Sequence, residues 1–485
     1  MIIMKCFPVF GLSNHRFYFV CCSRLLLIQF IVAFSASQSQ SQGLQPWSEN
    51  QWYWEYQGKP VMLIGGSDDD NLFQWPTERL VEQLDRIGAA GGNLIRNTMS
   101  DRKDKGFELY PFKQIEEGHY DLDQWNDAYW NRFETMLRET AKRSIIVQIE
   151  IWDRFDYTDS GGSNRWQIHP YNPKNNVNYT YATSGFAKNY PDHPGANKQP
   201  FFYTTPQQRN NATVLKYQRK FVDKMLDISL RYDHVLYCMD NETKAQPEWG
   251  AYWANLVKSR ASKDGKKVFV TEMWDDWNLK AERHRQTFDH PELYDFVDVS
   301  QNNHNSGRKH WDNFLFVKNY LSKQPRPINT TKTYGATGNK FGHTDQDAVE
   351  RIWRHLLAGA ASVRFHRPDS GLGINDKAVA CIKAARLVEA EVAFWNLSPA
   401  MDRIQTQEPN HAYAASLDKE TLVVFFTGQH EITLKGKRKS MNRTIKWIDV
   451  DSGVENASYR YERLNQVTIK PPVKGNWVAI IREIR

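Results

Sequence analysis

Carboxylate and amide side chains follow two apolar runs of the sequence directly. In YCMDNETKAQPEWG, residues 237–250, the run ends in Asp240, Asn241 and Glu242, and Pro247 then opens a predicted helix. In VFVTEMWDDWNL, residues 268–279, Glu272 follows the apolar run in the same way. A carboxyl group at the end of a buried strand can be kept protonated by partial burial and can then serve as a general acid. These side chains are therefore either the acid and base of an active site or the caps and ion pairs of a stable fold.

Other polar and aromatic side chains stand at the ends of the remaining predicted strands. They could bind the hydroxyl groups of a substrate, or the cations among them could hold sulfate or carboxylate groups, for which arginine offers a bidentate fork. The alternative is that they pair with carboxylates of the same region. The candidates for substrate binding are Asn241, Asp69, Arg96, Glu150, Asp153, Trp274, Asp275, His304, Lys332, Tyr334 and His366. The sequence has no HExxH pattern or close His pair, so we expect no metal and no other cofactor.

Eight short apolar runs alternate with eight helical patterns between residues 53 and 398, which predicts an α/β fold. Parallel strands need helical crossovers of this kind, and eight strand-then-helix units predict a (β/α)8 TIM barrel. A barrel gathers all eight strand ends around one mouth, whereas the alternative, a doubly wound sheet, offers a single crevice. The expected strands lie in 59–66, 93–97, 145–152, 234–239, 267–274, 295–301, 326–335 and 361–366. The expected helices are 77–90, 123–142, 207–230, 248–262, 280–288, 311–322, 345–360 and 376–394.

Three further segments complete the predicted organisation around the barrel. Residues 1–37 combine basic residues, a short apolar segment and small residues near Ser37, which is typical of a cleaved signal peptide and predicts a secreted or periplasmic protein. Residues 38–52 read as a leader. The long loop 153–206 is too aromatic for a linker, and we interpret it as a wall or lid over the barrel mouth, or as a structural flap. Residues 399–485 alternate in short runs, which predicts a small antiparallel β-sandwich.

Composition excludes several classes of function. The formal net charge of +7 falls to +4 without residues 1–37, because Lys5, Arg16 and Arg24 are the only charged residues removed. This scattered charge does not indicate a nucleic-acid partner, and after signal cleavage we expect no membrane partner. Cys238 and Cys381 then remain as two isolated thiols in apolar runs, which form no disulfide framework. The absence of a GxGxxG fingerprint or phosphate loop argues against nucleotide chemistry.

The order of elements, with Asn241 and Glu242 ending the fourth strand, resembles the superfamily of retaining barrel glycoside hydrolases known as the cellulase-like clan. The resemblance covers the whole barrel, and a short strand at 52–57 and the C-terminal sandwich also fit it. It implies that Glu242 is the acid/base, that Asn241 binds a sugar hydroxyl, and that the substrate is a polysaccharide or oligosaccharide. It also places a second Glu at the end of strand seven, but this chain has no carboxylate between Asp312 and Asp345.

Glu272 is the predicted second carboxylate in place of the strand-seven Glu. A separation of about 5 Å from Glu242 would suit a covalent intermediate, and about 6.5–9.5 Å would leave room for an attacking water. The sequence leaves both mechanisms open. We predict a secreted glycoside hydrolase, and an anionic or sulfated substrate is one of its options. The alternatives are a non-catalytic carbohydrate-binding protein on a degenerate barrel and a polysaccharide lyase with Tyr334 or His304 as base and Lys332 neutralising a uronate. The sugar, the linkage and the oligomeric state stay open.

Overall fold

The computed structural model describes residues 43–485, apart from 102, 436–442, 456–461, 465–467 and 484–485. The predicted signal peptide and the first residues of the predicted leader lie outside the described residues. From Gly43 on, the chain forms one compact unit. In this described part, none of the helices has the length and apolar character needed to cross a membrane.

Eight parallel strands form the central sheet, in the spatial order β10-β9-β8-β5-β4-β13-β12-β11. They are β4 (Leu63–Gly66), β5 (Leu94–Thr98), β8 (Ile146–Trp152), β9 (Val235–Asp240), β10 (Val270–Thr271), β11 (Val297–Asp298), β12 (Ile328–Asn329) and β13 (Ser362–Phe365). This order is the chain order read around a circle. Between β10 and β11, the Thr271 hydroxyl donates to the Phe296 carbonyl at 2.8 Å, so the two ends of the sheet approach each other. The eight predicted strands thus form a nearly closed barrel.

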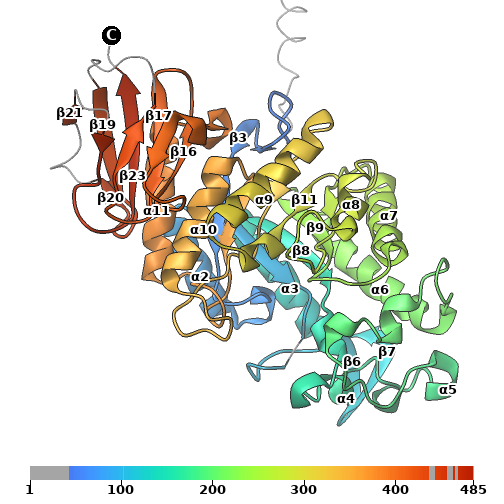
Figure 1. Cartoon of the computed structure of the whole chain (residues 1–485). Coiled ribbons are helices and arrows are strands. Elements are labelled where there is room, and N and C mark those ends of the chain that lie inside the picture. Colours follow the sequence, from blue (N-terminus) through green and yellow to red (C-terminus); the bar gives the residue numbers. More distant parts are fainter. Residues whose placement is uncertain (1–42, 102, 436–442, 456–461, 465–467, 484–485) are drawn as a thin grey trace, which may run out of the picture. The chain divides into compact units, whose positions relative to one another are not determined.

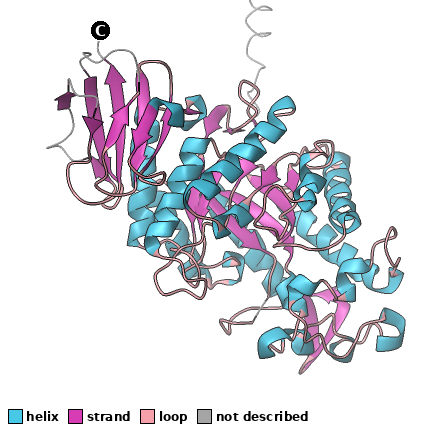
Figure 2. Cartoon of the chain, viewed as in Figure 1, coloured by secondary structure: helices cyan, strands magenta, loops and turns pink. Residues whose placement is uncertain are grey.

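A helix follows each barrel strand, as the sequence predicts. The eight are α2 (Thr77–Ala89), α3 (Asp127–Lys142), α6 (Ala212–Ser229), α7 (Pro247–Lys263), α8 (Glu282–Phe288), α9 (Gly307–Tyr320), α10 (Asp345–Ala358) and α11 (Asp376–Glu391). Figures 1 and 2 show these helices around the strands of the barrel. Because the strands are covered by helices outside and by packed side chains inside, β9 is buried along its whole length. That double burial explains its nearly continuous apolar sequence.

Two segments near the N-terminal half differ from the sequence prediction. Residues from Gly43 on belong to the folded unit, since β1 (Gln45–Pro46), β2 (Trp54–Tyr56) and β3 (Lys59–Val61) form a three-stranded antiparallel sheet. A hairpin of β6 (Phe112–Glu116) and β7 (His119–Trp125) precedes α3. The helix predicted from residue 123 therefore begins only at Asp127, where the Asn126 side chain accepts a hydrogen bond from the Ala128 N–H.

The long segment 153–206 consists of short helical turns packed on aromatic side chains. Its elements are η2 (Arg154–Tyr157), η3 (Ser160–Gly162), α4 (Arg165–Ile168), η4 (Pro173–Asn175), α5 (Tyr181–Ser184), η5 (Pro194–Ala196) and η6 (Pro200–Tyr203). Tyr157 stacks on Phe201 with ring centroids 3.9 Å apart, and Trp166 is fully buried. Other short 3-10 helices are η1 (Leu72–Gln74), η7 (Ser300–His304), η8 (Leu321–Lys323), η9 (Phe394–Asn396) and η10 (Met401–Arg403).

Two antiparallel sheets follow the barrel, in the region where the sequence predicts a sandwich. The larger contains β14 (Ser398–Pro399), β16 (Ala412–Ser416), β17 (Thr421–Phe426), β19 (Arg443–Asp449), β20 (Val454–Glu455), β21 (Glu462–Leu464) and β23 (Trp477–Glu483). The smaller contains β15 (Ile404–Thr406), β18 (Ile432–Leu434) and β22 (Thr468–Ile469). Alternate residues of β17 face opposite sides: Val424 shares a buried cluster with Ile432, whereas Phe425 stacks on Trp353 of α10. The larger sheet is thereby packed on both faces.

Candidate active site

Glu242 follows the end of β9 in an unusual backbone conformation. Its φ is +60°, in the left-handed region, which costs a residue with a side chain about 1–3 kcal/mol. Backbone hydrogen bonds hold the turn on both sides, because the Asn241 N–H donates to the Trp152 carbonyl and the Thr243 N–H donates to the Met273 carbonyl, both at 2.8 Å. Such strain persists where the surrounding structure fixes it, and it is concentrated at functional sites.

The Glu242 carboxylate is surrounded by donors from three other strand ends. Its Oε1 accepts hydrogen bonds from Lys332 Nζ at 2.5 Å, from the Tyr334 hydroxyl at 3.0 Å and from Gln301 Nε2 at 3.0 Å. Its Oε2 faces Arg154 Nη2 at 3.6 Å. Lys332 Nζ also donates to Asn241 Oδ1 at 2.5 Å, so the predicted Asn241 and Glu242 pair shares one ammonium group.

These contacts set the protonation state of Glu242. Burial alone would raise its pKa, but the charges of Lys332 and Arg154, together with the hydrogen bond from Lys332, hold the pKa well below its usual range. The carboxylate is therefore ionised, which is the opposite of the protonated acid that the sequence predicts. The physical reason lies at the end of strand seven, where a second carboxylate would raise the pKa and Lys332 lowers it.

A buried ionic network lies beside this group and fixes Arg96. Arg96 contacts Glu150 through Nε at 2.5 Å and Asp70 through Nη1 at 2.8 Å. Arg364 reaches Asp70 at 3.3 Å and His366 reaches it at 3.5 Å. Arg96 and Glu150 are fully buried. They lie close to the site as predicted, but as supports within the barrel and not as groups open to a substrate.

Tyr334 connects Glu242 to two histidines. Its ring centroid lies 4.8 Å from that of His304 and 5.1 Å from that of His366. Burial lowers the pKa of His304, so this imidazole is neutral near pH 7. Burial and the neighbouring Glu242 raise the pKa of Tyr334 well above its usual range, so its hydroxyl stays protonated and acts as a hydrogen-bond donor.

Asp275 is joined to Glu242 through Arg154. Arg154 Nη2 contacts Asp275 Oδ2 at 2.7 Å and Glu242 Oε2 at 3.6 Å. Both contacts use the same nitrogen, so the two carboxylate oxygens lie at most about 6.3 Å apart, the sum of 2.7 and 3.6 Å. Lys244 Nζ lies 3.5 Å from Asp275 Oδ2 on the outer side. Asp275 is therefore a carboxylate close to Glu242, although it belongs to the segment after β10.

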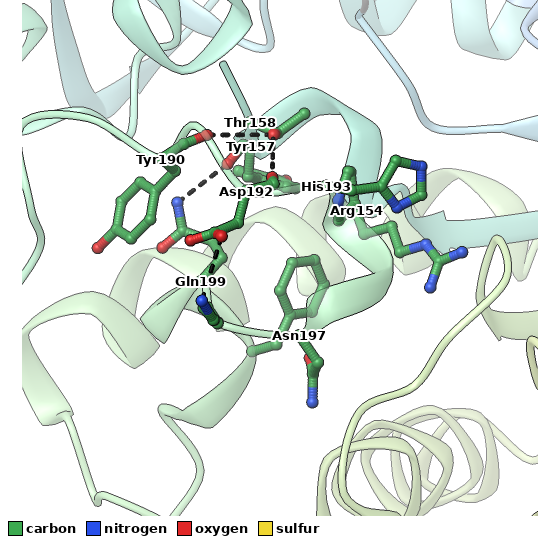
Figure 3. A pocket seen from close by; sticks show the side chains of 11 residues that line it. Arg154, Tyr157, Thr158, Tyr190, Asp192, His193, Asn197 and Gln199 are labelled. Carbon is green, nitrogen blue, oxygen red and sulfur yellow. Dashed lines mark hydrogen bonds and ion pairs between the residues drawn. The ribbon is translucent and has the colours of Figure 1, made fainter. Parts of the chain in front are cut away.

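The long segment 153–206 contributes Arg154 to the site. Figure 3 shows a pocket in this segment that Arg154 lines together with Tyr157, Thr158, Tyr190, Asp192, His193 and Gln199, among others. The Arg154 guanidinium extends beside the His193 imidazole, away from Tyr190 and Gln199 (Figure 3). The segment thus contributes a contact to Glu242, and its interpretation as a wall or lid stays a prediction.

The structure corrects the placement of Glu272. Its Oε1 accepts hydrogen bonds from the backbone N–H groups of Asp240 at 3.0 Å and Met273 at 2.9 Å. Its Oε2 faces α7, where a Cβ added to Gly250 would lie only 2.5 Å away. Burial, followed by the neighbouring Asp240 charge, raises its pKa well above the usual range. Glu272 therefore packs against the helix layer and does not share the partners of Glu242.

Three other predicted residues have structural contacts. Trp274 is buried and donates from Nε1 to the Thr287 hydroxyl of α8 at 2.7 Å, so it is not a sugar platform. Asp153 is buried and caps η2 by accepting from the Phe155 N–H at 3.1 Å. Asp69 accepts from Trp75 Nε1 at 2.9 Å, and it lines a small hollow at the rim with Asp70, Asn71, Ser100, Asp104 and Arg367.

The sequence prediction missed two residues that contact Glu242. Gln301 lies in η7, directly after the sixth strand, and Arg154 lies two residues after the third strand. Their positions after strand ends indicate that both residues could lie at the barrel mouth. Charge and amide chemistry alone did not separate them from the many other polar residues of these loops.

Several solved structures with a similar fold are described as glycoside hydrolases. A structure described as a glycoside hydrolase has a TM-score of 0.57 and 12% identity, over 91% of this chain and 96% of that chain. A glycoside hydrolase family 5 protein from Bacteroides vulgatus has a TM-score of 0.56 and 12% identity, over 91% and 93% of the two chains. A mutant of a family 5 mannosidase from Rhizomucor miehei, in complex with mannosyl-fructose, has a TM-score of 0.51 and 11% identity, over 73% and 99%.

No protein-family model matches the chain, and no curated protein sequence matches it. The structural likeness at such low identity concerns the fold. The chain has a (β/α)8-barrel fold similar to that of these glycoside hydrolases, followed by a C-terminal antiparallel region, as its order of elements predicts.

Proposed function

We propose that the protein is a secreted glycoside hydrolase that cleaves O-glycosidic bonds of an anionic polysaccharide or its oligosaccharides, with Glu242 as the reacting carboxylate. The observation that carries this proposal is the position of Glu242. It follows β9 at the mouth of a barrel shared with glycoside hydrolases, in a strained backbone conformation, and its carboxylate is ionised. Residues 1–37 support export, and the two C-terminal sheets support a sandwich packed on the barrel.

An ionised Glu242 suits the role of nucleophile. Its carboxylate attacks the anomeric carbon and forms a glycosyl ester while the bond from that carbon to the leaving oxygen breaks. Asp275 is the proposed acid/base: its protonated form gives a proton to the leaving oxygen and becomes a carboxylate, and this carboxylate then takes a proton from the water that hydrolyses the ester. Arg154 holds one oxygen of each carboxylate within about 6.3 Å of the other, and the proposed retaining reaction requires the two carboxyl groups to lie about 5–5.5 Å apart.

Cations at the site support an anionic substrate. Arg154 Nε and Nη1 are buried and have no hydrogen-bond partner among the described residues, although Nη2 of the same group contacts Asp275. These two donors lie on different sides of the guanidinium, and a carboxylate or sulfate that reaches either of them can accept a charge-assisted hydrogen bond.

A mutational test separates this proposal from its alternatives. Wild-type protein is screened against neutral, sulfated and uronic glycans, and products are identified by mass. We expect Glu242→Gln to lower kcat by at least about a thousandfold, since a nucleophile cannot be replaced by an amide. Azide should restore part of the activity of Glu242→Ala by forming a glycosyl azide, and Asp275→Asn should retain more activity toward substrates with good leaving groups.

Three outcomes would contradict the assignment. Full activity of Glu242→Gln would exclude this carboxylate, and binding without turnover by the wild type would favour a non-catalytic carbohydrate-binding protein. Products with an unsaturated sugar would indicate a lyase. Tyr334 is a poor base for that reaction because its hydroxyl stays protonated, and the neutral His304 would then be the group to replace.

A further inference from the structure

Two of the most exposed aromatic side chains of the described residues lie beside the candidate active site. The Trp277 side chain is 60% exposed and that of Phe341 is 41% exposed. Trp277 follows β10 and Phe341 lies in the connection between β12 and α10, so both stand in loops at the carboxyl ends of barrel strands. Large apolar side chains that remain exposed near a polar site commonly mark a place where a ligand binds.

These two rings connect to Glu242 through two further aromatic groups. The Trp277 ring lies 5.5 Å from the His304 ring, and His304 lies 5.7 Å from Phe341 and 4.8 Å from Tyr334, all between centroids. Phe341 also lies 5.4 Å from Tyr334. Since the Tyr334 hydroxyl donates to Glu242 at 3.0 Å, the series runs without a break from solvent to the reacting carboxylate. We call Trp277, His304, Phe341 and Tyr334 the aromatic strip.

A buried arginine fixes the backbone that carries the aromatic strip. Arg351 of α10 donates from Nε to the Asn305 carbonyl and from Nη1 to the Tyr334 carbonyl, both at 2.9 Å. Asn305 in turn donates from its side chain to the Trp277 carbonyl at 2.9 Å. The loops after β10, β11 and β12 are thereby tied to one another. A platform held in this way loses little conformational freedom when a ligand binds.

We propose that the aromatic strip is a sugar-binding subsite, in which Trp277 and Phe341 stack on the apolar face of a pyranose ring adjacent to the bond that is cleaved. Aromatic rings offer a large, flat apolar surface at low entropic cost, and the C–H face of a pyranose ring matches it. This inference rests on the proposed function. It assigns the stacking role to Trp277, which lies three residues after the buried Trp274 that was predicted from the sequence to bind substrate.

The position of the aromatic strip relative to the cationic groups defines two sides of the site. Arg154 approaches Oε2 of Glu242, whereas Tyr334 and Lys332 approach Oε1. An anionic group on Arg154 and a stacked ring on the aromatic strip would therefore meet different oxygens of the same carboxylate. Because the stacked ring is proposed to lie next to the bond that is cleaved, a substrate with a sugar unit on each side of that bond would fill the site, and binding should strengthen with chain length.

The test uses ring deletions in the full-length protein. Trp277→Ala, Phe341→Ala and the double variant are compared in a Glu242→Gln background by affinity electrophoresis in gels that contain polygalacturonate, chondroitin sulfate, carboxymethylcellulose, xylan or glucomannan. In the active background, KM and kcat are measured with oligosaccharides of increasing length from whichever polymer the wild type cleaves. The control is Tyr320→Ala at the end of α9, whose side chain is 37% exposed but lies at the opposite end of the barrel from the mouth.

We expect Trp277→Ala to weaken retardation and to raise KM for the longer oligosaccharides by about tenfold, with a smaller change in kcat. Trp277→Phe should restore most of the binding because it keeps a ring, and Tyr320→Ala should behave as its parent. Unchanged retardation and KM in both alanine variants would overturn the subsite while leaving the proposed function intact. A wild type that cleaves none of the polymers would refute the proposed function. The electrophoresis would still test the subsite in that case, because the absence of retardation in every gel would refute sugar binding by the aromatic strip.

Discussion

Replacing Lys332 with methionine tests the charge balance of the site most directly. The Lys332 and Glu242 side chains are only 3% and 13% exposed, and Nζ lies 2.5 Å from Oε1. Removing one partner of a buried ion pair leaves an uncompensated charge and costs about 3–5 kcal/mol. Because Tyr334, Gln301 and Arg154 still contact Glu242, we expect the lower end for Lys332→Met, a loss of about 3 kcal/mol in the free energy of unfolding.

The assay is urea-induced unfolding of four proteins at pH 7: wild type, Lys332→Met, Glu242→Gln and the double variant. In the double variant neither partner is charged, so most of the loss should be recovered, with a coupling energy of about 2–3 kcal/mol. Lys318→Met is the matched control, because the hydrogen bond that Lys318 Nζ donates goes to a backbone carbonyl, that of Ala358 at 3.3 Å, and not to a carboxylate. A coupling energy near zero, or an equal loss in Lys318→Met, would refute the buried-pair argument.

The same variants predict a pH dependence of stability. The pKa of Glu242 in the folded protein is held well below its usual range, whereas an unfolded Glu titrates near about 4.3. Its ion pair with Lys332 therefore stabilises the fold fully above that pH. As pH falls further, the unfolded state binds a proton first and this contribution is lost. The difference in unfolding free energy between wild type and Lys332→Met should be constant between about pH 5 and about pH 7 and should narrow below about pH 4.

Two further predictions concern packing and substrate charge. Gly250→Ala should destabilise the protein by about 1–3 kcal/mol, because the new Cβ would lie 2.5 Å from Glu272 Oε2 and 3.0 Å from the Tyr294 hydroxyl. Gly88→Ala in α2, which meets nothing within 4 Å, should instead stabilise it by about 0.5–1 kcal/mol in the same thermal or urea assay. For a uronic substrate, methyl esterification of its carboxylates should lower kcat/KM by about tenfold or more. Lys332→Met should reduce this preference for the free uronate over its methyl ester. Equal kcat/KM values for the wild type on the free and esterified substrates would contradict an anion-binding role.

The barrel could be predicted from the sequence because its signals are local. The apolar run of β9, the proline that opens α7 and the helical periodicity of α2 each identify an element within a window of a few residues. The hairpin of β6 and β7 was missed for the opposite reason. Both strands carry mostly polar, partly exposed residues, and His119–Trp125 runs almost directly into α3. Only the antiparallel pairing, which depends on the partner strand, distinguishes them from a loop.

The residues of the candidate site could be predicted from the sequence where they lie at the carboxyl ends of barrel strands. Asn241, Glu242, Lys332 and Tyr334 meet as expected because parallel strands bring their carboxyl ends to one mouth. Glu272 also follows a strand, yet it faces α7. The direction of a side chain at this point depends on where the strand ends and how the following residues turn, and this information is not local to the sequence.

Lys332 determines the charge balance of the candidate site, because it lies at the end of strand seven, where a second carboxylate would otherwise be expected. Glycosidic bond cleavage develops positive charge at the anomeric carbon, and Glu242 is the anion that would stabilise it. In the structure, much of that negative charge is already neutralised by Lys332 at 2.5 Å. A neutral sugar leaves this pair intact and gains little from Glu242. A carboxylate or sulfate on the substrate can accept hydrogen bonds from Lys332 or Arg154 and release Glu242 toward the reacting carbon. The cation that weakens the site for neutral sugars is thus the element that would make it selective for anionic ones.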